Sequence, residues 1–242
     1  MPAVHIAAVQ GLPLPWQLRQ VGGCSAVQKD EAGSDQPKTA TMIPNHLRPP
    51  YRFIAFDVET ANRNAHSICQ MGFACVDDWG QIDNFSLLVD PGEAFSAFNT
   101  QLHGIDAAMV RGAPQFPAVI AALAPLMAQQ PIVQHSGFDA RAVAAACGWH
   151  GLEVPSLHWV DSVTIARRAW PEFKGKGGHG LGHLKQALSL EFQHHDAGED
   201  ARAAAQVVLC AEIKTGRSFV EILARQAAKA PRAAKVYYEP FE

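Results

Sequence analysis

Apolar residues first gather in a repeated pattern at Tyr51. From there three runs rich in aromatic and branched side chains follow one another, separated by short polar breaks, which is typical of β-strands. The runs are YRFIAFDVE, SICQMGFACVD and QIDNFSLLVD. Because consecutive strands with short connections usually pair in chain order, we expect an antiparallel meander of three strands.

After the meander the chain alternates between helical and strand patterns. Five segments have the apolar spacing of helices, namely FPAVIAALAPLMAQQ, FDARAVAAACGW, VTIARRAW, LGHLKQALSL and EDARAAAQVVLCAEIK. Two short runs, PIVQHS and LHWVDS, are typical of strands. A meander followed by such alternation predicts an α/β fold, in which a mixed β-sheet is flanked by helices.

The two ends of the chain lack these patterns. Residues 1–48 show no sustained periodicity, and we expect this segment to be disordered or loosely attached. Met42 lies just before the first strong pattern, so a true start at Met42 is a hypothesis. We assign residues 49–215 to the folded domain and residues 216–242 to a C-terminal helix and tail.

The composition narrows the class of protein. The chain has 242 residues, 48% of them hydrophobic, and a formal net charge of −3. No apolar run reaches the roughly 18 residues that a membrane-spanning helix needs. The five cysteines form no CxxC pair, which favours reduced thiols. We therefore expect a cytoplasmic protein with no membrane partner, and the slight acidic excess alone gives no indication of a nucleic-acid partner.

One stretch departs from this overall charge. Residues 167–185 hold five basic residues and one acidic residue. The segment could attract a phosphate backbone or could be a solvated loop, and the sequence leaves both open. His179 and His183 lie in it with HxxxH spacing, but no third zinc ligand is close in sequence. We expect both histidines to face outward from an amphipathic helix.

Carboxylates occur where an apolar strand should end. Asp57 and Glu59 follow FIAF, and residues two apart on a strand project from the same face. Two neighbouring carboxylates repel one another and lose hydration when partly buried, so a cation would stabilise them. A strand that simply runs out into solvent explains the pair equally well.

Two further acidic positions lie at predicted helix starts. In HSGFD, Ser136 and Asp139 have the spacing of a helix-capping pattern. In HHDAGED, Asp196 and Glu199 have the same spacing and predict a helix that begins near Ala197. Capping gives no role to two other residues at that second helix entrance, His195 and Asp200.

In this order, the three fragments resemble the histidine-bearing (DEDDh) branch of the DEDD 3′–5′ exonucleases. That branch includes the proofreading epsilon-type subunit of bacterial DNA polymerase III and enzymes of the ribonuclease T type. The DxE of the family is matched by Asp57 and Glu59, and its second aspartate motif by residues 135–139. Its H-x4-D motif is matched by His195 and Asp200. The resemblance covers roughly residues 51–212, with shorter similarities at Leu102-His103-Gly104-Ile105 and Asp161-Ser162.

The resemblance implies a ribonuclease-H-like fold and hydrolysis of phosphodiester bonds at single-stranded 3′ ends of DNA or RNA. It also implies that four carboxylates hold two divalent metal ions, Mg²⁺ or Mn²⁺, and these are Asp57, Glu59, Asp139 and Asp200. Oxygen ligands without cysteine suit such hard ions better than zinc. His195 would be the general base, a role that suits its ordinary pKa of about 6.5.

The family positions also indicate residues that bind the terminal nucleotide. These are Thr60, Ala61, His103, Gly104, Ile105 and Phe138. For Phe138 we favour packing in the core, because aromatic side chains are mostly buried. We expect His135 to be structural and His194 to serve packing or local hydrogen bonding.

Two other classes of function compete with this one. A non-catalytic scaffold with the same fold would not need all five proposed catalytic residues. A glycosidase with paired carboxylates would need neither a fourth carboxylate nor His195. We therefore expect an enzyme that binds single-stranded 3′ ends. Proofreading with a DNA polymerase, RNA trimming and the oligomeric state are left open.

Overall fold

The strands form one mixed sheet around a central strand. The computed structural model describes residues 42–45, 47–191 and 193–224. Its five-stranded sheet has the order β3-β2-β1-β4-β5. Antiparallel pairs join β2 to both β1 and β3, while β4 runs parallel to β1 and β5 parallel to β4. The strands are β1 (Phe53–Thr60), β2 (Ile68–Val76), β3 (Ile82–Leu88), β4 (Ile132–Gln134) and β5 (Trp159–Asp161).

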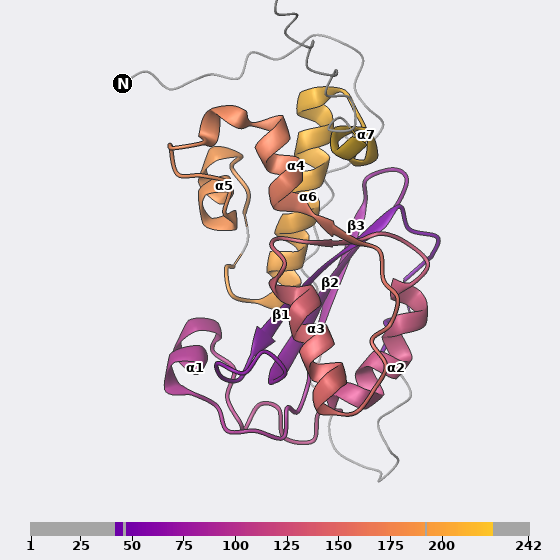
Figure 1. Ribbon diagram of the computed structural model, residues 1–242, viewed down its shortest axis with the longest axis vertical. Helices are drawn as coiled ribbons and strands as arrows, with labels where there is room; N and C mark the ends of the chain where they lie inside the picture. Colours follow the sequence, from indigo (N-terminus) through magenta and orange to yellow (C-terminus); the bar gives the residue numbers. More distant parts are fainter. Residues whose placement is uncertain (1–41, 46, 192, 225–242) are drawn as a thin grey trace, which may run out of the picture.

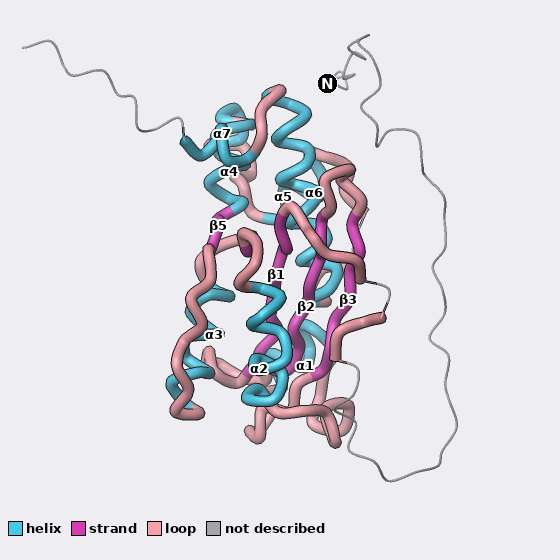
Figure 2. Tube along the Cα trace, turned by 90° about the vertical axis from the view of Figure 1, so that its right-hand side faces the viewer, coloured by secondary structure: helices cyan, strands magenta, loops and turns pink. Residues whose placement is uncertain are grey.

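This arrangement confirms the predicted meander, which Figure 2 shows as three strands side by side. The helices are α1 (Ala97–His103), α2 (Phe116–Met127), α3 (Phe138–Trp149), α4 (Ser162–Ala169), α5 (Leu181–Ala187), α6 (Ala197–Thr215) and α7 (Phe219–Ala224). A single 3₁₀ turn, η3 (Pro171–Phe173), follows α4. The five predicted helices and the two short strands are all present. The pattern did not predict α1, which buries none of its residues.

Alternation along β1 divides the core into two layers. Phe53 and Ala55 pack in a cluster with α4, α5, α6 and α7. Ile54 and Phe56 point to the other face and pack with α2 and α3. Successive strand residues face opposite sides. Residues 57 and 59 therefore point to the face that α6 covers. Figure 1 shows β1 directed toward α1 and away from α7.

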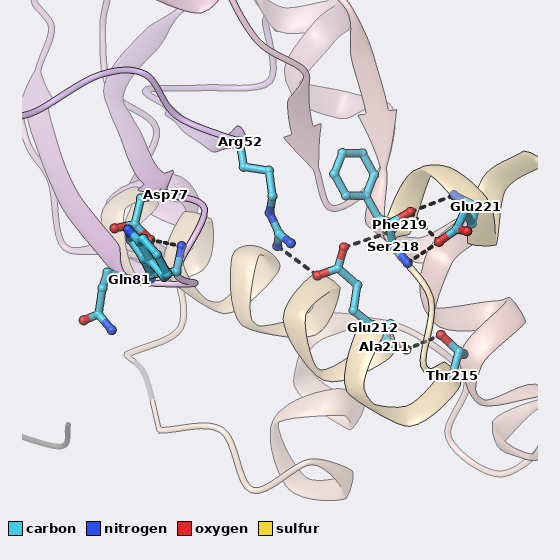
Figure 3. A network of polar contacts seen from close by, with 10 residues as sticks. Arg52, Asp77, Gln81, Ala211, Glu212, Thr215, Ser218, Phe219 and Glu221 are labelled. Carbon is cyan, nitrogen blue, oxygen red and sulfur yellow. Dashed lines mark hydrogen bonds and ion pairs between the residues drawn. The ribbon is translucent and has the colours of Figure 1, made fainter. Parts of the chain in front are cut away.

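The start of β1 is joined to the far end of α6 and to α7 (Figure 3). The Arg52 guanidinium donates to Glu212 Oε2 at 2.8 Å, and the backbone N–H of Phe219 donates to Glu212 Oε1 at 2.8 Å. The ring of Phe219 meets that of Phe53 edge to face, with centroids 5.5 Å apart. These contacts fix α7 against the end of the sheet opposite to the carboxylates.

The division at residues 48 and 215 stays a prediction. Residues 1–41 lie outside the described residues, as do residues 225–242. Leu47 is buried in one core layer, and Phe219 and Ile222 are buried in the other. Within the described residues, no helix is both long and apolar enough to cross a bilayer.

Candidate active site

The carboxyl end of β1 presents the first two carboxylates. Asp57 and Glu59 project toward the α6 face, as the alternation of buried residues along the strand requires. The pairing with β2 changes register between Glu59 and Thr60. This irregularity takes Thr60 out of the regular ladder and leaves its carbonyl free for other donors.

β2 allows α6 to approach these carboxylates closely. Gly72 pairs with Asp57 across the sheet. A Cβ at Gly72 would lie 2.0 Å from the carbonyl carbon of Ala197, so only glycine leaves room for the helix start. Gln70 pairs with Glu59, and its Oε1 accepts from Ala197 N at 3.0 Å. Two residues of β2 thus seat the first turn of α6 beside Asp57 and Glu59.

The first turn of α6 supplies the third carboxylate. Asp196 is the N-cap and accepts from the backbone N–H of Glu199 at 3.0 Å, which confirms the predicted cap and the helix start at Ala197. Asp200 is buried one turn inside. One oxygen each of Asp57, Glu59 and Asp200 can lie within 4.8 Å of one another, close enough to share a cation.

The fourth carboxylate comes from the start of α3, on the other side of β1. Asp139 lies in the first turn, is buried, and accepts from the backbone N–H of Val58 at 3.2 Å. The predicted cap by Ser136 is wrong. Gly137 is the N-cap and has no side chain that could cap the helix. Ser136 precedes it with a left-handed φ of 115°, and its Oγ accepts from the backbone N–H of Phe138 at 3.4 Å. The chain thereby turns sharply enough to place Asp139 against β1.

Burial and mutual repulsion raise the pKa values of these four carboxyls. Burial raises the pKa of Glu59 to about 8, with added repulsion from Asp200 and Asp139. Burial likewise raises the pKa of Asp139 to about 7. Burial and the neighbouring carboxylates raise the pKa of Asp57 well above its usual range, and burial raises that of Asp200. Bound cations would reverse this effect and favour the ionised forms.

Two histidines stack at the entrance of α6. The rings of His194 and His195 lie 4.1 Å apart and nearly parallel, at 10°. Nδ1 of His194 lies 2.9 Å from Asp200 Oδ1, and the backbone N–H of His195 donates to Asp200 Oδ2 at 2.9 Å. Burial and the neighbouring His194 lower the pKa of His195. A neutral imidazole beside a carboxylate cluster is able to accept a proton.

Helix α1 holds the backbone that follows Glu59. Asn99 Nδ2 donates to the Thr60 carbonyl at 2.8 Å, and His103 Nε2 lies 3.1 Å from the same oxygen. The other ring nitrogen of His103 accepts from the backbone N–H of Ile105 at 3.0 Å. Since Nδ1 accepts, Nε2 carries the proton and donates to Thr60. Burial lowers the pKa of His103, in agreement with this neutral form.

A cavity of about 270 Å³ collects these groups. Among the predicted residues, it is lined by Asp57, Glu59, Thr60, Phe138, Asp139, His195 and Asp200. The core position favoured for Phe138 is wrong, because this side chain is 37% exposed and lines the cavity. It belongs to the first turn of α3.

The structure does not bring every predicted residue to this cavity. Ala61 and Ile105 are buried in a small apolar cluster, and Gly104 ends α1 with a left-handed φ of 78°. His103 contacts the site through the Thr60 carbonyl. The cavity also includes residues that were not predicted to bind the nucleotide, namely Val58, Asn99, Leu102, His135, Ser136 and His194. The segment Leu102-His103-Gly104-Ile105, which resembles a family motif, was the only sequence signal near Asn99 and Leu102.

The HxxxH pair differs from its prediction. His179 is only 9% exposed, and its Nε2 donates to the Trp170 carbonyl at 2.8 Å. His183 has its Nε2 buried as well. Neither histidine faces outward from a helix, because His179 lies in the loop before α5 and Gly177 of that loop packs against the His183 ring. No grouping of three metal-binding side chains in the described residues includes either one.

Sequence comparison relates this chain to nucleases and polymerases. The family model described as Exonuclease (RNase_T) matches residues 54–208. The PolC-type DNA polymerase III of Streptococcus thermophilus (strain ATCC BAA-491 / LMD-9) is 28% identical over 216 residues. The alignment covers 86% of this chain and only 14% of that polymerase.

Structure comparison finds exonuclease folds. Exonuclease X, solved in complex with 5′ overhanging duplex DNA, has a TM-score of 0.57 at 23% identity. That match covers 70% of this chain and 96% of the other. The nuclease domain of 3′hExo, a DEDDh family member bound to rAMP, has a TM-score of 0.58 at 18% identity, covering 69% and 94% of the two chains. These likenesses confirm the predicted ribonuclease-H-like fold.

Proposed function

This chain belongs to the exonuclease family, and we propose that within it the protein is a 3′–5′ exonuclease acting on single-stranded ends. One observation carries the proposal. Four carboxylates from three separate elements, β1, α3 and α6, meet in one cavity beside His195. A fold that used the site only for docking would have no need to crowd four groups whose ionisation is so unfavourable.

The acidic groups of the site are able to bind metal, and we propose Mg²⁺ or Mn²⁺ held by Asp57, Glu59, Asp139 and Asp200. These four carboxylates fit, because hard divalent ions prefer carboxylate oxygens, while His194 and His195 place ring nitrogens beside Asp200 as well. The raised pKa of Glu59 also fits a site built for cations. When bound, a pair of such ions supplies activation of water and stabilisation of the leaving 3′ oxygen.

The side chains divide the remaining work. His195 is the proposed general base that takes the proton of the attacking water. Thr60 presents its backbone to the terminal nucleotide, held in place by Asn99 and His103. Phe138 offers an exposed ring at the cavity on which a base can stack. Thr60 and Phe138 would thus hold the terminal nucleotide where His195 can act on the water. This arrangement suits the removal of one nucleotide at a time from the end of a strand.

The substrate is proposed by analogy with the relatives. The curated relative is a DNA polymerase, and the compared structures hold DNA in one case and rAMP in the other. We therefore propose single-stranded DNA as the main substrate and RNA as the alternative. A polymerase is a proposed partner on the same basis.

The test is digestion of 5′-labelled single-stranded DNA and RNA with added Mg²⁺ or Mn²⁺. We expect stepwise shortening from the 3′ end, which stops in EDTA and resumes when metal is restored. Asp57→Asn and Asp200→Asn should each lose at least about 10³-fold in rate, since removal of a charged ligand disrupts the metal site. Asp83→Asn, at an exposed position on β3, is the matched control and should retain full activity. Full activity of the wild type in EDTA would contradict the proposal.

A further inference from the structure

A second cavity lies between α4 and the glycine-rich loop that leads into α5. Its volume is about 510 Å³, and it is lined by Arg167, Pro171, Lys174, Gly175, Gly178 and His179. None of these residues is acidic, and both Arg167 and Lys174 are exposed. The cavity therefore presents positive charge and glycine backbone, a combination that suits a phosphate group.

One hydrogen bond connects this cavity to the active site. His135 lines the cavity of the four carboxylates, and its Nε2 donates to the carbonyl of His179 at 3.0 Å. His179 lines the basic cavity. Burial lowers the pKa of His135 to about 4, so this contact is between neutral groups. The walls of the two cavities are therefore in direct contact through His135 and His179.

The loop that forms one wall, residues 174–180, is fixed by its own contacts. The backbone N–H groups of Lys176 and Gly178 both donate to the Phe173 carbonyl, at 3.0 and 3.1 Å. A Cβ at Gly177 would lie 2.2 Å from His183 Nδ1, so the loop passes tightly over that ring. Because the loop backbone is already ordered by these contacts, binding of a ligand there loses little conformational entropy of the loop.

Two charged residues next to the cavity, Arg168 and Glu172, contact other elements. Arg168 points away from the cavity and donates from Nη1 to the Ile222 carbonyl of α7 at 2.7 Å. The Glu172 carboxylate lies 4.0 Å from Lys214 of α6. Among the residues that line the cavity, Arg167 and Lys174 carry the positive charge.

We propose that this cavity binds the phosphodiester backbone of the strand whose 3′ end occupies the active site. The inference rests on the proposed function and adds a second contact region upstream of the cleaved bond. It also explains why a chain of net charge −3 concentrates basic residues beside a cluster of carboxylates. The contact is to phosphate, which DNA and RNA share, so both polymers use it.

The experiment compares substrates that do and do not reach the cavity. The double variant Arg167→Gln/Lys174→Gln is assayed on a dinucleotide and on a long oligonucleotide, in DNA and RNA series, with saturating Mn²⁺. We expect the ratio of kcat/KM for the long substrate to that for the dinucleotide to fall about tenfold, through KM. The slope of log kcat/KM against log salt should become shallower by about 1.4, since each single-strand phosphate contact contributes about 0.7.

The matched control is Arg111→Gln/Arg217→Gln, which removes two exposed charges that line neither cavity. It should leave both the length ratio and the salt slope as in the wild type. An unchanged ratio in Arg167→Gln/Lys174→Gln, or an equal loss on both substrates, would overturn the inference. Failure of the wild type to cleave even the dinucleotide would instead contradict the proposed function.

Discussion

His195 combines a strained backbone with a central position in the site. Its φ of 68° is left-handed, a conformation that few residues other than glycine and asparagine adopt without cost. The conformation turns the backbone N–H toward Asp200 and stacks the ring on His194. Strain of this kind is retained where the surrounding contacts over-determine it, as they do here.

The variant His195→Asn separates the proposed base from the metal site. Asparagine tolerates the same backbone and keeps the N–H that Asp200 accepts, but its amide cannot take a proton at neutral pH. We expect kcat to fall by about 10² to 10⁴, with Mn²⁺ affinity within about threefold of the wild type. Single-turnover kinetics and calorimetric titration with Mn²⁺ measure the two quantities. A matching loss of Mn²⁺ affinity would show that His195 acts as a ligand.

His103 is expected to affect binding of the nucleotide more than chemistry. Its Nε2–H is one of two donors to the Thr60 carbonyl, so His103→Ala leaves that group held by Asn99 alone. Loss of about 1 kcal/mol corresponds to an increase in KM of about fivefold with little change in kcat. His103→Gln, whose amide can still donate, should recover most of the loss. Equal KM values for the wild type and His103→Ala would contradict this role.

At the scale of elements, the site depends on how closely α6 meets β2. Gly72→Ala would place a Cβ against the backbone of Ala197, which cannot move aside as a side chain can. We expect α6 to shift outward and carry Asp200 away from Asp57. Mn²⁺ affinity should fall at least about tenfold and Tm by several degrees, since overpacking costs about 1–3 kcal/mol.

Gly148→Ala on α3 is the matched control, because a Cβ there meets no atom within 4 Å. That variant should keep the wild-type Mn²⁺ affinity and be as stable or slightly more stable. Wild-type Mn²⁺ affinity in Gly72→Ala would show that β2 does not position the site.

Elements with a strong apolar period were predictable, and those held by polar contacts were not. The segment FDARAVAAACGW coincides with α3, whose buried residues recur at helical spacing. α1 has no buried residue and is held by the Ser96 cap and by Asn99 and His103. No periodicity could reveal such a helix.

The same reasoning applies to the candidate site. The four carboxylates and His195 stand in short motifs, so their sequence spacing identifies them as candidates. Gln70 and Gly72 act on Ala197, which is more than 100 residues away in the chain. A glutamine within an apolar strand run was the one local sign of that contact. His179 is held inward by its hydrogen bond to the Trp170 carbonyl. Apolar spacing along a helix carries no information about such a side-chain contact to the backbone.

At the scale of the whole molecule, the site opposes the stability of the fold when metal is absent. The carboxyl of Glu59 has its pKa raised to about 8, so the folded protein holds a proton that the unfolded chain releases near pH 4.5. The stability that this proton confers is present at low pH and is lost as the pH rises through about 8. Asp57 and Asp139 act with the same sign.

Histidines do not obscure this effect at alkaline pH. Burial lowers the pKa values of His103, His135 and His195, so their contribution is complete once the pH exceeds the ordinary value of about 6.5. Burial also raises the pKa values of Cys69 and Cys75 to about 12, so above about pH 8.5 these thiols ionise only in the unfolded chain. Between about pH 7 and about pH 8 the shifted carboxyls therefore dominate the change.

We expect the Tm of the protein in EDTA to fall by at least about 3 °C from about pH 7 to about pH 8, and saturating Mg²⁺ to abolish most of that fall. Glu59→Gln, which removes the group with pKa about 8, should be more stable than the wild type at the upper pH and show a shallower decline. Asp83→Asn should follow the wild type, because its carboxyl is exposed on β3. Differential scanning calorimetry measures all three. A Tm in EDTA that is constant or rises over this interval would mean that the carboxylates are stabilised by the protein itself, and the site would then have no electrostatic need for cations.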